Sequence, residues 1–111
     1  IATERGAIKV DETCQTNVPG VYAIGDVNGK SMLAHTAYRE AEVAVNTILG
    51  KKDIMRYNAI PAVIYTNPEV GSVGETEESA KEKGLEVWNL DMRFTPQGVS
   101  LYSCTNTTDE M

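Results

Sequence analysis

Several features are scarce in this chain of 111 residues, and each scarcity argues against a class of protein. No apolar run approaches the ~20 residues needed to span a bilayer, and no basic-then-apolar leader opens the sequence. We therefore expect neither a membrane protein nor a secretory precursor. Ten Lys and Arg residues face sixteen Asp and Glu residues, which gives a net charge of -6. Because an acidic chain does not attract a phosphate backbone, nucleic acid is not expected as a partner.

Cysteine is scarce as well, with only Cys14 and Cys104. The two lie far apart in the sequence and fit neither a metal-ligand spacing nor a disulfide framework. We expect two buried or idle thiols in a reducing, cytoplasmic protein, and no metal site. The first residue is Ile1, and the polar stretch 103–110 has no periodicity, as is typical of frayed termini. The chain is therefore expected to be a fragment.

The first half of the chain predicts a strand, a glycine turn and a helix. Residues 8–10 alternate as in a small strand. Residues 21–24 are apolar at every position, which is typical of a fully buried strand in a parallel sheet. A loop at residues 26–31 leads to a helical pattern that ends at Gly50. The predicted stripe consists of Ala34, Ala37, Ala41, Ala44 and Ile48, widened by Leu33, Val45 and Leu49, with Glu40, Glu42 and Asn46 off it.

The second half begins after a charged, aperiodic segment at residues 51–58, where we place a domain boundary. Residues 62–65 predict a second buried strand, and residues 70–74 a weaker one thinned by glycine. Residues 76–83 predict a short helix whose acidic first turn and basic last turn agree with the helix dipole. Residues 85–94 can form one more strand. The predicted domains are residues 1–52 and 59–111.

The segment GDVNGKS at residues 25–31 approaches a nucleotide phosphate loop. Only three residues separate Gly25 from Gly29, one fewer than that loop needs to wrap phosphates, and Asp26 would bring a carboxylate toward them. A phosphate-loop nucleotide-binding protein is therefore kept as an alternative hypothesis. A third hypothesis is a noncatalytic acidic domain that self-associates through exposed apolar surface.

Two motifs resemble the pyridine nucleotide-disulfide oxidoreductase family. The segment TNVPGVYAIGDV at residues 16–27 is similar to its second flavin-contacting motif. The next stretch, MLAHTA at residues 32–37 and on to Glu40 and Ala41, also resembles that family. The segment IPAVIYTNPEVGSVG at residues 60–74 resembles the opening of its dimerisation domain. The resemblance covers about residues 4–84. It implies an α/β protein: the strand–turn–helix end of a FAD-binding doubly wound fold, followed by part of an α+β dimerisation domain.

The resemblance also implies a partial FAD site. Asp26 would hydrogen-bond the ribityl chain of FAD, because a carboxylate can accept from two hydroxyls in strong, charge-assisted bonds. Gly25 would let the backbone approach the cofactor. Met32, Leu33 and Ala34 would open the helix whose first amides point at the pyrimidine edge of the flavin.

His35 is the only histidine, and the resemblance places it near the flavin without making it the base. A structural, hydrogen-bonded role is the stronger expectation for a lone histidine beside an apolar stripe. No residue is assigned a catalytic role. The chain lacks the Cys pair with four intervening residues, the Gly-x-Gly-x-x-Gly fingerprint and the family's His base.

The whole enzyme implied by the resemblance would pass electrons from a dihydrolipoyl group through the Cys pair and FAD to NAD. It would be a homodimer with a lipoyl-bearing protein as partner. This segment would supply one wall of the FAD site and part of the dimer surface, so the isolated chain is expected to be inactive. Glutathione, mercuric and trypanothione reductases share related motifs, and the substrate stays open.

Overall fold

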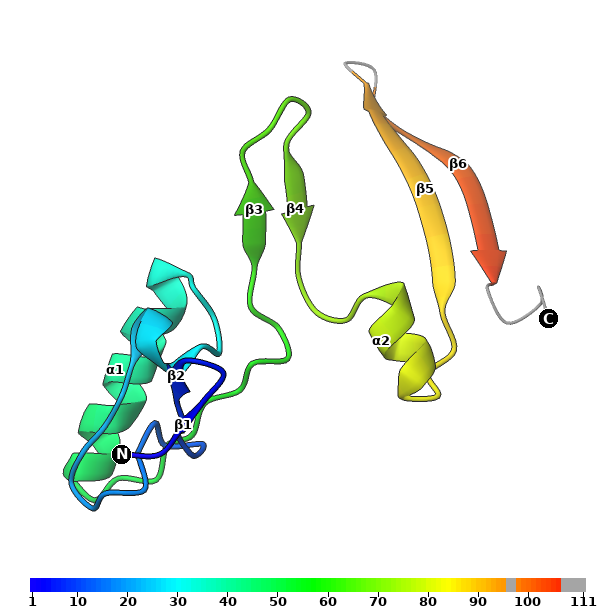
Figure 1. Cartoon of the computed structure of the whole chain (residues 1–111). Helices are drawn as coiled ribbons and strands as arrows, with labels where there is room; N and C mark the ends of the chain where they lie inside the picture. Colours follow the sequence, from blue (N-terminus) through cyan, green and yellow to red (C-terminus); the bar gives the residue numbers. More distant parts are fainter. Residues whose placement is uncertain (96–97, 107–111) are drawn as a thin grey trace. The chain divides into compact units, whose positions relative to one another are not determined.

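The computed structural model describes the backbone of residues 1–95 and 98–106 and the side chains of residues 1–90. The chain divides into two compact units, residues 1–74 and 75–111 (Figure 1). Among the described residues, each unit contains one α-helix; the first unit has two antiparallel strand pairs and the second has one. The sequence-based division into residues 1–52 and 59–111 concerns domains of a larger fold and stays a prediction. Within the described residues, no helix combines the length and the apolar character required to cross a membrane.

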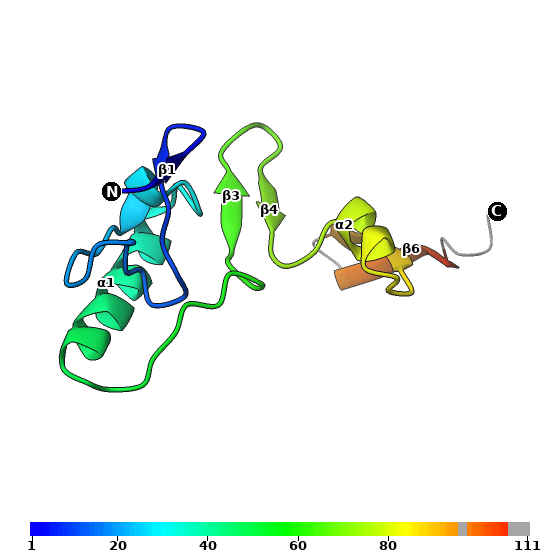
Figure 2. The same ribbon diagram turned by 60° about the horizontal axis from the view of Figure 1, so that its bottom comes forward.

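The N-terminal part of the first unit packs against one long helix. Strands β1 (Thr3–Glu4) and β2 (Ala7–Ile8) form a short antiparallel hairpin. The 3-10 helix η1 (Gly25–Asn28) contacts both β2 and the helix α1 (Ala34–Ile48). Figures 1 and 2 show these segments gathered along α1. The small strand predicted at residues 8–10 thus forms slightly earlier, and the predicted helix is confirmed.

The buried face of α1 differs from the predicted stripe. The buried residues of the helix are Thr36, Glu40, Val43 and Ala44, of which Glu40 and Val43 have no exposed surface. Ile48 and Val45, which belong to the predicted stripe, are more than half exposed. The reason is that α1 packs against a polar turn, which requires hydrogen-bond partners as well as apolar contact. The prediction that Glu40 lies off the buried face is therefore wrong.

The segment at residues 21–24 is not the fully buried strand that its composition predicts. Tyr22 forms only an isolated antiparallel bridge with Gln15, and Val21 and Ile24 are exposed. A central parallel strand needs a neighbour on each side. Among the described residues, no parallel strand pairs with this segment. Its extended backbone is held by local contacts such as the 3.0 Å hydrogen bond from the Ala23 amide to the Cys14 carbonyl.

The core of the first unit is small. Cys14, Val43, Ala44 and Met55 form its buried cluster. Tyr22 and Tyr57 pack against that cluster as partly buried side chains. The expected burial of Cys14 is thus confirmed, and its thiol is free. The side chain of Cys104 lies outside the described residues.

The Cys14 thiol is expected to be unreactive in the folded chain. Burial, together with the nearby charge of Glu40, raises its pKa to about 11. Because the folded pKa exceeds the unfolded one, stability is retained below the usual thiol pKa and lost as pH rises toward 11. In a Cys104→Ser background at about pH 8, Ellman's reagent should label Cys14 only after urea unfolding. Equal labelling rates with and without urea would contradict this assignment.

Strands β3 (Ala62–Ile64) and β4 (Val70–Ser72) form an antiparallel hairpin in which Ala62 lies opposite Ser72. Both strands were predicted from the sequence. The predicted burial of the first is wrong, because Val63 and Ile64 are about half exposed. Each strand pairs on one edge only, and among the described residues no layer covers the faces of the hairpin.

The second unit contains α2 (Glu77–Glu82), β5 (Trp88–Thr95) and β6 (Gly98–Asn106), and β5 pairs antiparallel with β6. Thr76 and Ser79 form a capping box at the start of α2, which confirms the predicted helix. The strand predicted within residues 85–94 is confirmed as β5. The polar end was expected to be frayed, but residues 103–106 belong to β6; residues 107–110 lie outside the described residues.

Candidate functional site

The turn that carries Asp26 lies between the segment at residues 21–24 and α1. Asp26 is in the first turn of η1, and its carbonyl accepts a 3.0 Å hydrogen bond from the Gly29 amide. Its carboxylate is exposed and bonds to no side chain or amide of the described residues. Asp26 lines an open cavity of about 620 Å³ together with residues 4–10 of the β1–β2 hairpin. The carboxylate is therefore free to accept hydrogen bonds from a ligand.

Glycine is required on both sides of this turn. Gly25 has a φ of 74°, and Gly29 has a φ of 68°, both in the left-handed region. A Cβ at Gly29 would lie 2.7 Å from the Cβ of Ala7, so β2 packs directly against the Gly29 backbone. At Gly29, the turn backbone therefore lies in close contact with β2 of the β1–β2 hairpin.

The N-terminus of α1 presents free backbone donors. Leu33 is the extended N-cap residue and provides no side-chain cap. The amides of Thr36 and Ala37 both donate to the Leu33 carbonyl. The preceding amides of Ala34 and His35 have no acceptor among the described residues. The predicted opening at Met32 is thus two residues early, since the helix begins at Ala34, and Met32 is exposed.

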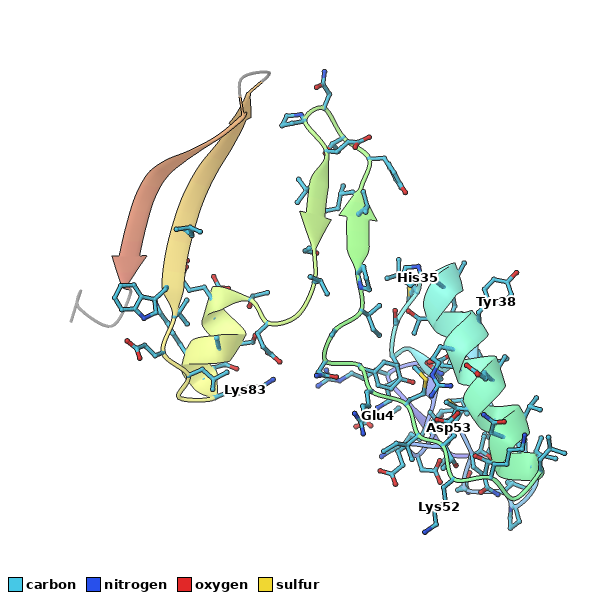
Figure 3. All side chains as sticks on the ribbon, turned by 180° about the vertical axis from the view of Figure 1, so that it is seen from behind. Glu4, His35, Tyr38, Lys52, Asp53 and Lys83 are labelled. Atoms are coloured by element: carbon cyan, nitrogen blue, oxygen red, sulfur yellow. The ribbon has the colours of Figure 1, made fainter. Side chains whose placement is uncertain are left out.

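His35 lies at the N-terminal end of α1 (Figure 3). Its ring is exposed, and Nε2 donates to the Pro61 carbonyl at 2.8 Å. This bond ties the start of α1 to the residue before β3. It fits the structural role that was expected for the lone histidine.

This turn is organised by a residue to which the sequence analysis gave no role, although the stretch that resembles the family contains it. Glu40 of α1 has no exposed surface. Its carboxylate accepts hydrogen bonds from the Gly25 amide at 2.5 Å, from Asn28 Nδ2 at 3.0 Å and from the Tyr57 hydroxyl at 2.7 Å. Periodicity gave no signal for Glu40, because the predicted apolar stripe contains neither Thr36 nor Val43, the buried residues that share its helix face. On this buried face of α1, the Glu40 carboxylate accepts hydrogen bonds from the turn that packs against the helix.

A second polar cluster lies toward the other end of α1. Arg39 contacts Asp53 through both guanidinium nitrogens, at 2.5 and 2.9 Å, and Asn46 donates to the same carboxylate at 2.8 Å. Figure 3 labels Asp53 near α1. The hydrogen bonds from Arg39 and Asn46 lower the pKa of Asp53 to about 2. This cluster holds the segment after α1 against the helix.

Asp53 is expected to titrate near pH 2 in the folded chain. Because its folded pKa lies below the unfolded value, its contribution to stability is present above about pH 4 and is lost as pH falls toward 2. Carboxyl chemical shifts followed by NMR during acid titration measure this midpoint. In Arg39→Gln the midpoint should move back toward the ordinary value of about 4. An unchanged midpoint in that variant would show that Arg39 does not cause the shift.

The structure thus brings the predicted site residues together in two places. Gly25 and Asp26 lie in the turn that packs on α1, while Leu33, Ala34 and His35 lie at the start of that helix. Their roles in binding a cofactor stay predictions. Among the described residues, no group of three or more His, Cys, Asp or Glu side chains is placed to hold a metal ion.

Comparison with known families identifies both parts of the chain. Residues 1–41 match the pyridine nucleotide-disulphide oxidoreductase family, and residues 60–109 match the dimerisation domain of the same family. The chain belongs to the pyridine nucleotide-disulphide oxidoreductases. The match at residues 60–109 corrects the expectation that the resemblance ends near residue 84. The phosphate-loop hypothesis is not favoured, because residues 25–31 lie inside the matched range.

Within this family, the chain is similar to dihydrolipoyl dehydrogenases. It is 51% identical to the enzyme of Chlamydia muridarum over 87 residues, which are 78% of this chain and 19% of that protein. It is 43% identical to the enzyme of Bacillus subtilis over 107 residues, which are 96% of this chain and 22% of that protein. The crystal structure of LpdA from Mycobacterium tuberculosis matches with a TM-score of 0.65 and 28% identity, over 78% of this chain and 19% of that one. The chain spans about a fifth of the length of these relatives.

Proposed function

We propose that this chain forms one wall of the FAD site and part of the dimer surface of a dihydrolipoyl dehydrogenase-like enzyme. The observation that carries the proposal is the order of two family matches, with the dimerisation domain following the flavin-domain segment. Relatives that bear the dihydrolipoyl dehydrogenase name support the same conclusion. The whole protein would oxidise dihydrolipoyl groups and pass the electrons through a Cys pair and FAD to NAD.

The residues present fit the flavin. The Asp26 carboxylate is exposed and unpaired among the described residues, so it can accept from two ribityl hydroxyls. The free amides at the start of α1 offer donors and partial positive charge to the pyrimidine edge of the ring. FAD, when bound, supplies the acceptor of the electron pair. This chain's own residues bind and orient it, and none of them serves as the catalytic base.

The partners and location follow from the same proposal. A homodimer would form through the dimerisation domain that begins near residue 60. A lipoyl-bearing protein would deliver the substrate, and a cytoplasmic site of action would keep the thiols reduced. The isolated chain would be inactive, since its relatives are about five times longer.

A chimera tests the proposal directly. In it, this chain replaces the 107 matched residues of the Bacillus subtilis enzyme. The purified chimera should carry FAD, as visible flavin absorbance, and should oxidise dihydrolipoamide with NAD. A folded chimeric dimer that takes up no FAD would refute the proposal.

Asp26→Ala in that chimera should weaken FAD binding by about 10- to 100-fold. The loss corresponds to about 1.5–3 kcal/mol, the usual value of hydrogen bonds to a charged group. Flavin fluorescence during titration of the apoprotein with FAD measures the affinity. Glu12→Gln, which changes an exposed carboxylate outside the lining of the cavity beside Asp26, is the matched control and should bind FAD normally. Equal affinity in both variants would remove Asp26 from the site.

A further inference from the structure

The buried carboxylate of Glu40 has an uncommon set of partners. Charged side chains are almost never fully buried unless they are paired. Within the part of the chain that the structure describes, no Lys, Arg or His forms an ion pair with Glu40. Its partners are three donors: the Gly25 amide, the Asn28 amide group and the Tyr57 hydroxyl. The Glu40 carboxylate thus accepts three hydrogen bonds and connects three segments of the chain to one another.

Two of these bonds bracket Asp26 in the sequence. Gly25 precedes Asp26 directly, and Asn28 follows it by two residues. Asn28 is itself buried, donates to the Ala23 carbonyl at 3.3 Å and accepts from the Lys30 amide at 2.9 Å. The backbone on both sides of Asp26 is therefore fixed to α1, while the Asp26 carboxylate faces solvent. The third bond, from Tyr57, enters from the segment after α1 and does not touch the turn.

We propose that Glu40 is the positioning residue of the flavin site, because its buried carboxylate fixes the turn that presents Asp26 to the ribityl hydroxyls. The inference rests on the proposed function. Glu40 does not contact the cofactor. Because Glu40 already orders the Asp26 turn in the free protein, FAD binding loses less conformational entropy in ordering that turn. The same bonds would also set the direction of the Asp26 carboxylate.

The test uses Glu40→Gln in the chimera described above. A glutamine keeps the size of the side chain, but an N–H₂ group replaces one of its two oxygens. Because Gly25 donates to Oε2 and Asn28 to Oε1, that group meets a donor of the turn in either orientation, and one bond to the turn is lost. The FAD dissociation constant should rise about tenfold or more, and FAD should dissociate faster. Visible circular dichroism of the bound flavin should change, because the ribityl chain is held differently.

Two further variants separate positioning from general stability. Tyr57→Phe removes a bond to Glu40 but leaves both bonds to the turn, so the melting temperature should fall while FAD affinity changes far less than in Glu40→Gln. Glu42→Gln, which alters an exposed glutamate on the same helix, should match the unsubstituted chimera in both measurements. If Glu40→Gln does not fold, Glu40→Asp replaces it, since aspartate keeps the charge but withdraws the carboxylate by one methylene.

The outcomes are distinguishable. If the unsubstituted chimera folds without binding FAD, the proposed function itself fails. If it binds FAD and Glu40→Gln or Glu40→Asp binds equally well, only the positioning role fails. A loss of FAD affinity in proportion to the lost melting temperature across Tyr57→Phe and the Glu40 variants would also overturn that role.

Discussion

Replacing Glu40 by leucine is expected to lower the free energy of unfolding by about 3 kcal/mol or more. The carboxylate is fully buried and accepts bonds from Gly25, Asn28 and Tyr57. Leucine accepts none of these bonds, and each buried donor left without an acceptor costs about 1–3 kcal/mol. Because leucine carries no charge, the variant no longer has to bury a charged group, and this offsets part of the cost. The net loss is therefore smaller than the summed cost of the three unpaired donors. Urea unfolding of this chain, followed by far-ultraviolet circular dichroism, measures the change.

The matched control for this prediction is Glu42→Leu. Glu42 lies two residues further along α1, is exposed and pairs with Arg39 at 2.7 Å. Exposed ion pairs contribute about 0–1 kcal/mol, so this variant should stay close to the unsubstituted chain. If Glu40→Leu were as stable as Glu42→Leu, the cost of burying the carboxylate would equal the value of its hydrogen bonds. Glu40 would then contribute no net stability to the fold.

The second large effect is expected at Gly29. Gly29→Ala should destabilise the chain by about 2–4 kcal/mol, through left-handed backbone strain and overpacking. Gly29 has a φ of 68°, and the new Cβ would lie 2.7 Å from the Cβ of Ala7. Because that neighbour belongs to β2, the hairpin would have to move away from η1. Urea unfolding measures the loss.

Gly20→Ala separates the two contributions. Gly20 has a φ of 78°, but a Cβ there meets no atom within 4 Å. That variant should therefore lose only the backbone contribution, about 1–2 kcal/mol. An equal loss in the two variants would show that β2 does not pack closely on Gly29. A larger loss at Gly29 would confirm the close approach.

The helix signals in this sequence are local, and they predicted the helices well. Apolar periodicity and Gly50 located α1, and Thr76 with the charged turns located α2. A helix satisfies its own backbone hydrogen bonds, so its bounds depend mainly on the residues within it. The strand signals were less reliable. Residues 21–24 have the composition of a buried strand, yet a strand forms only where another strand supplies the partner for its backbone.

In the candidate site, too, some features follow from local sequence and others depend on tertiary contacts. The exposed Asp26 and the free amides before Thr36 follow from motifs that can be read in the sequence. Glu40 could not be recognised from periodicity alone, because a glutamate among apolar residues normally marks a solvent face. Its burial depends on which element packs against α1, and that element is a turn with backbone donors. Tyr57 reaches the same carboxylate from a segment whose composition indicates only a linker.

The sequence by itself thus determined that α1 and α2 form and roughly where they lie, that glycine turns flank them, and which family the motifs resemble. Only the tertiary structure decided which face of α1 is buried, that Glu40 joins that face to the Asp26 turn, and that Gly29 touches β2. The physical reason is that propensity and capping act over a few neighbouring residues. Hydrogen bonds such as those from Gly25 and Tyr57 to Glu40 join residues 15 and 17 positions apart, and they exist only once the chain has folded.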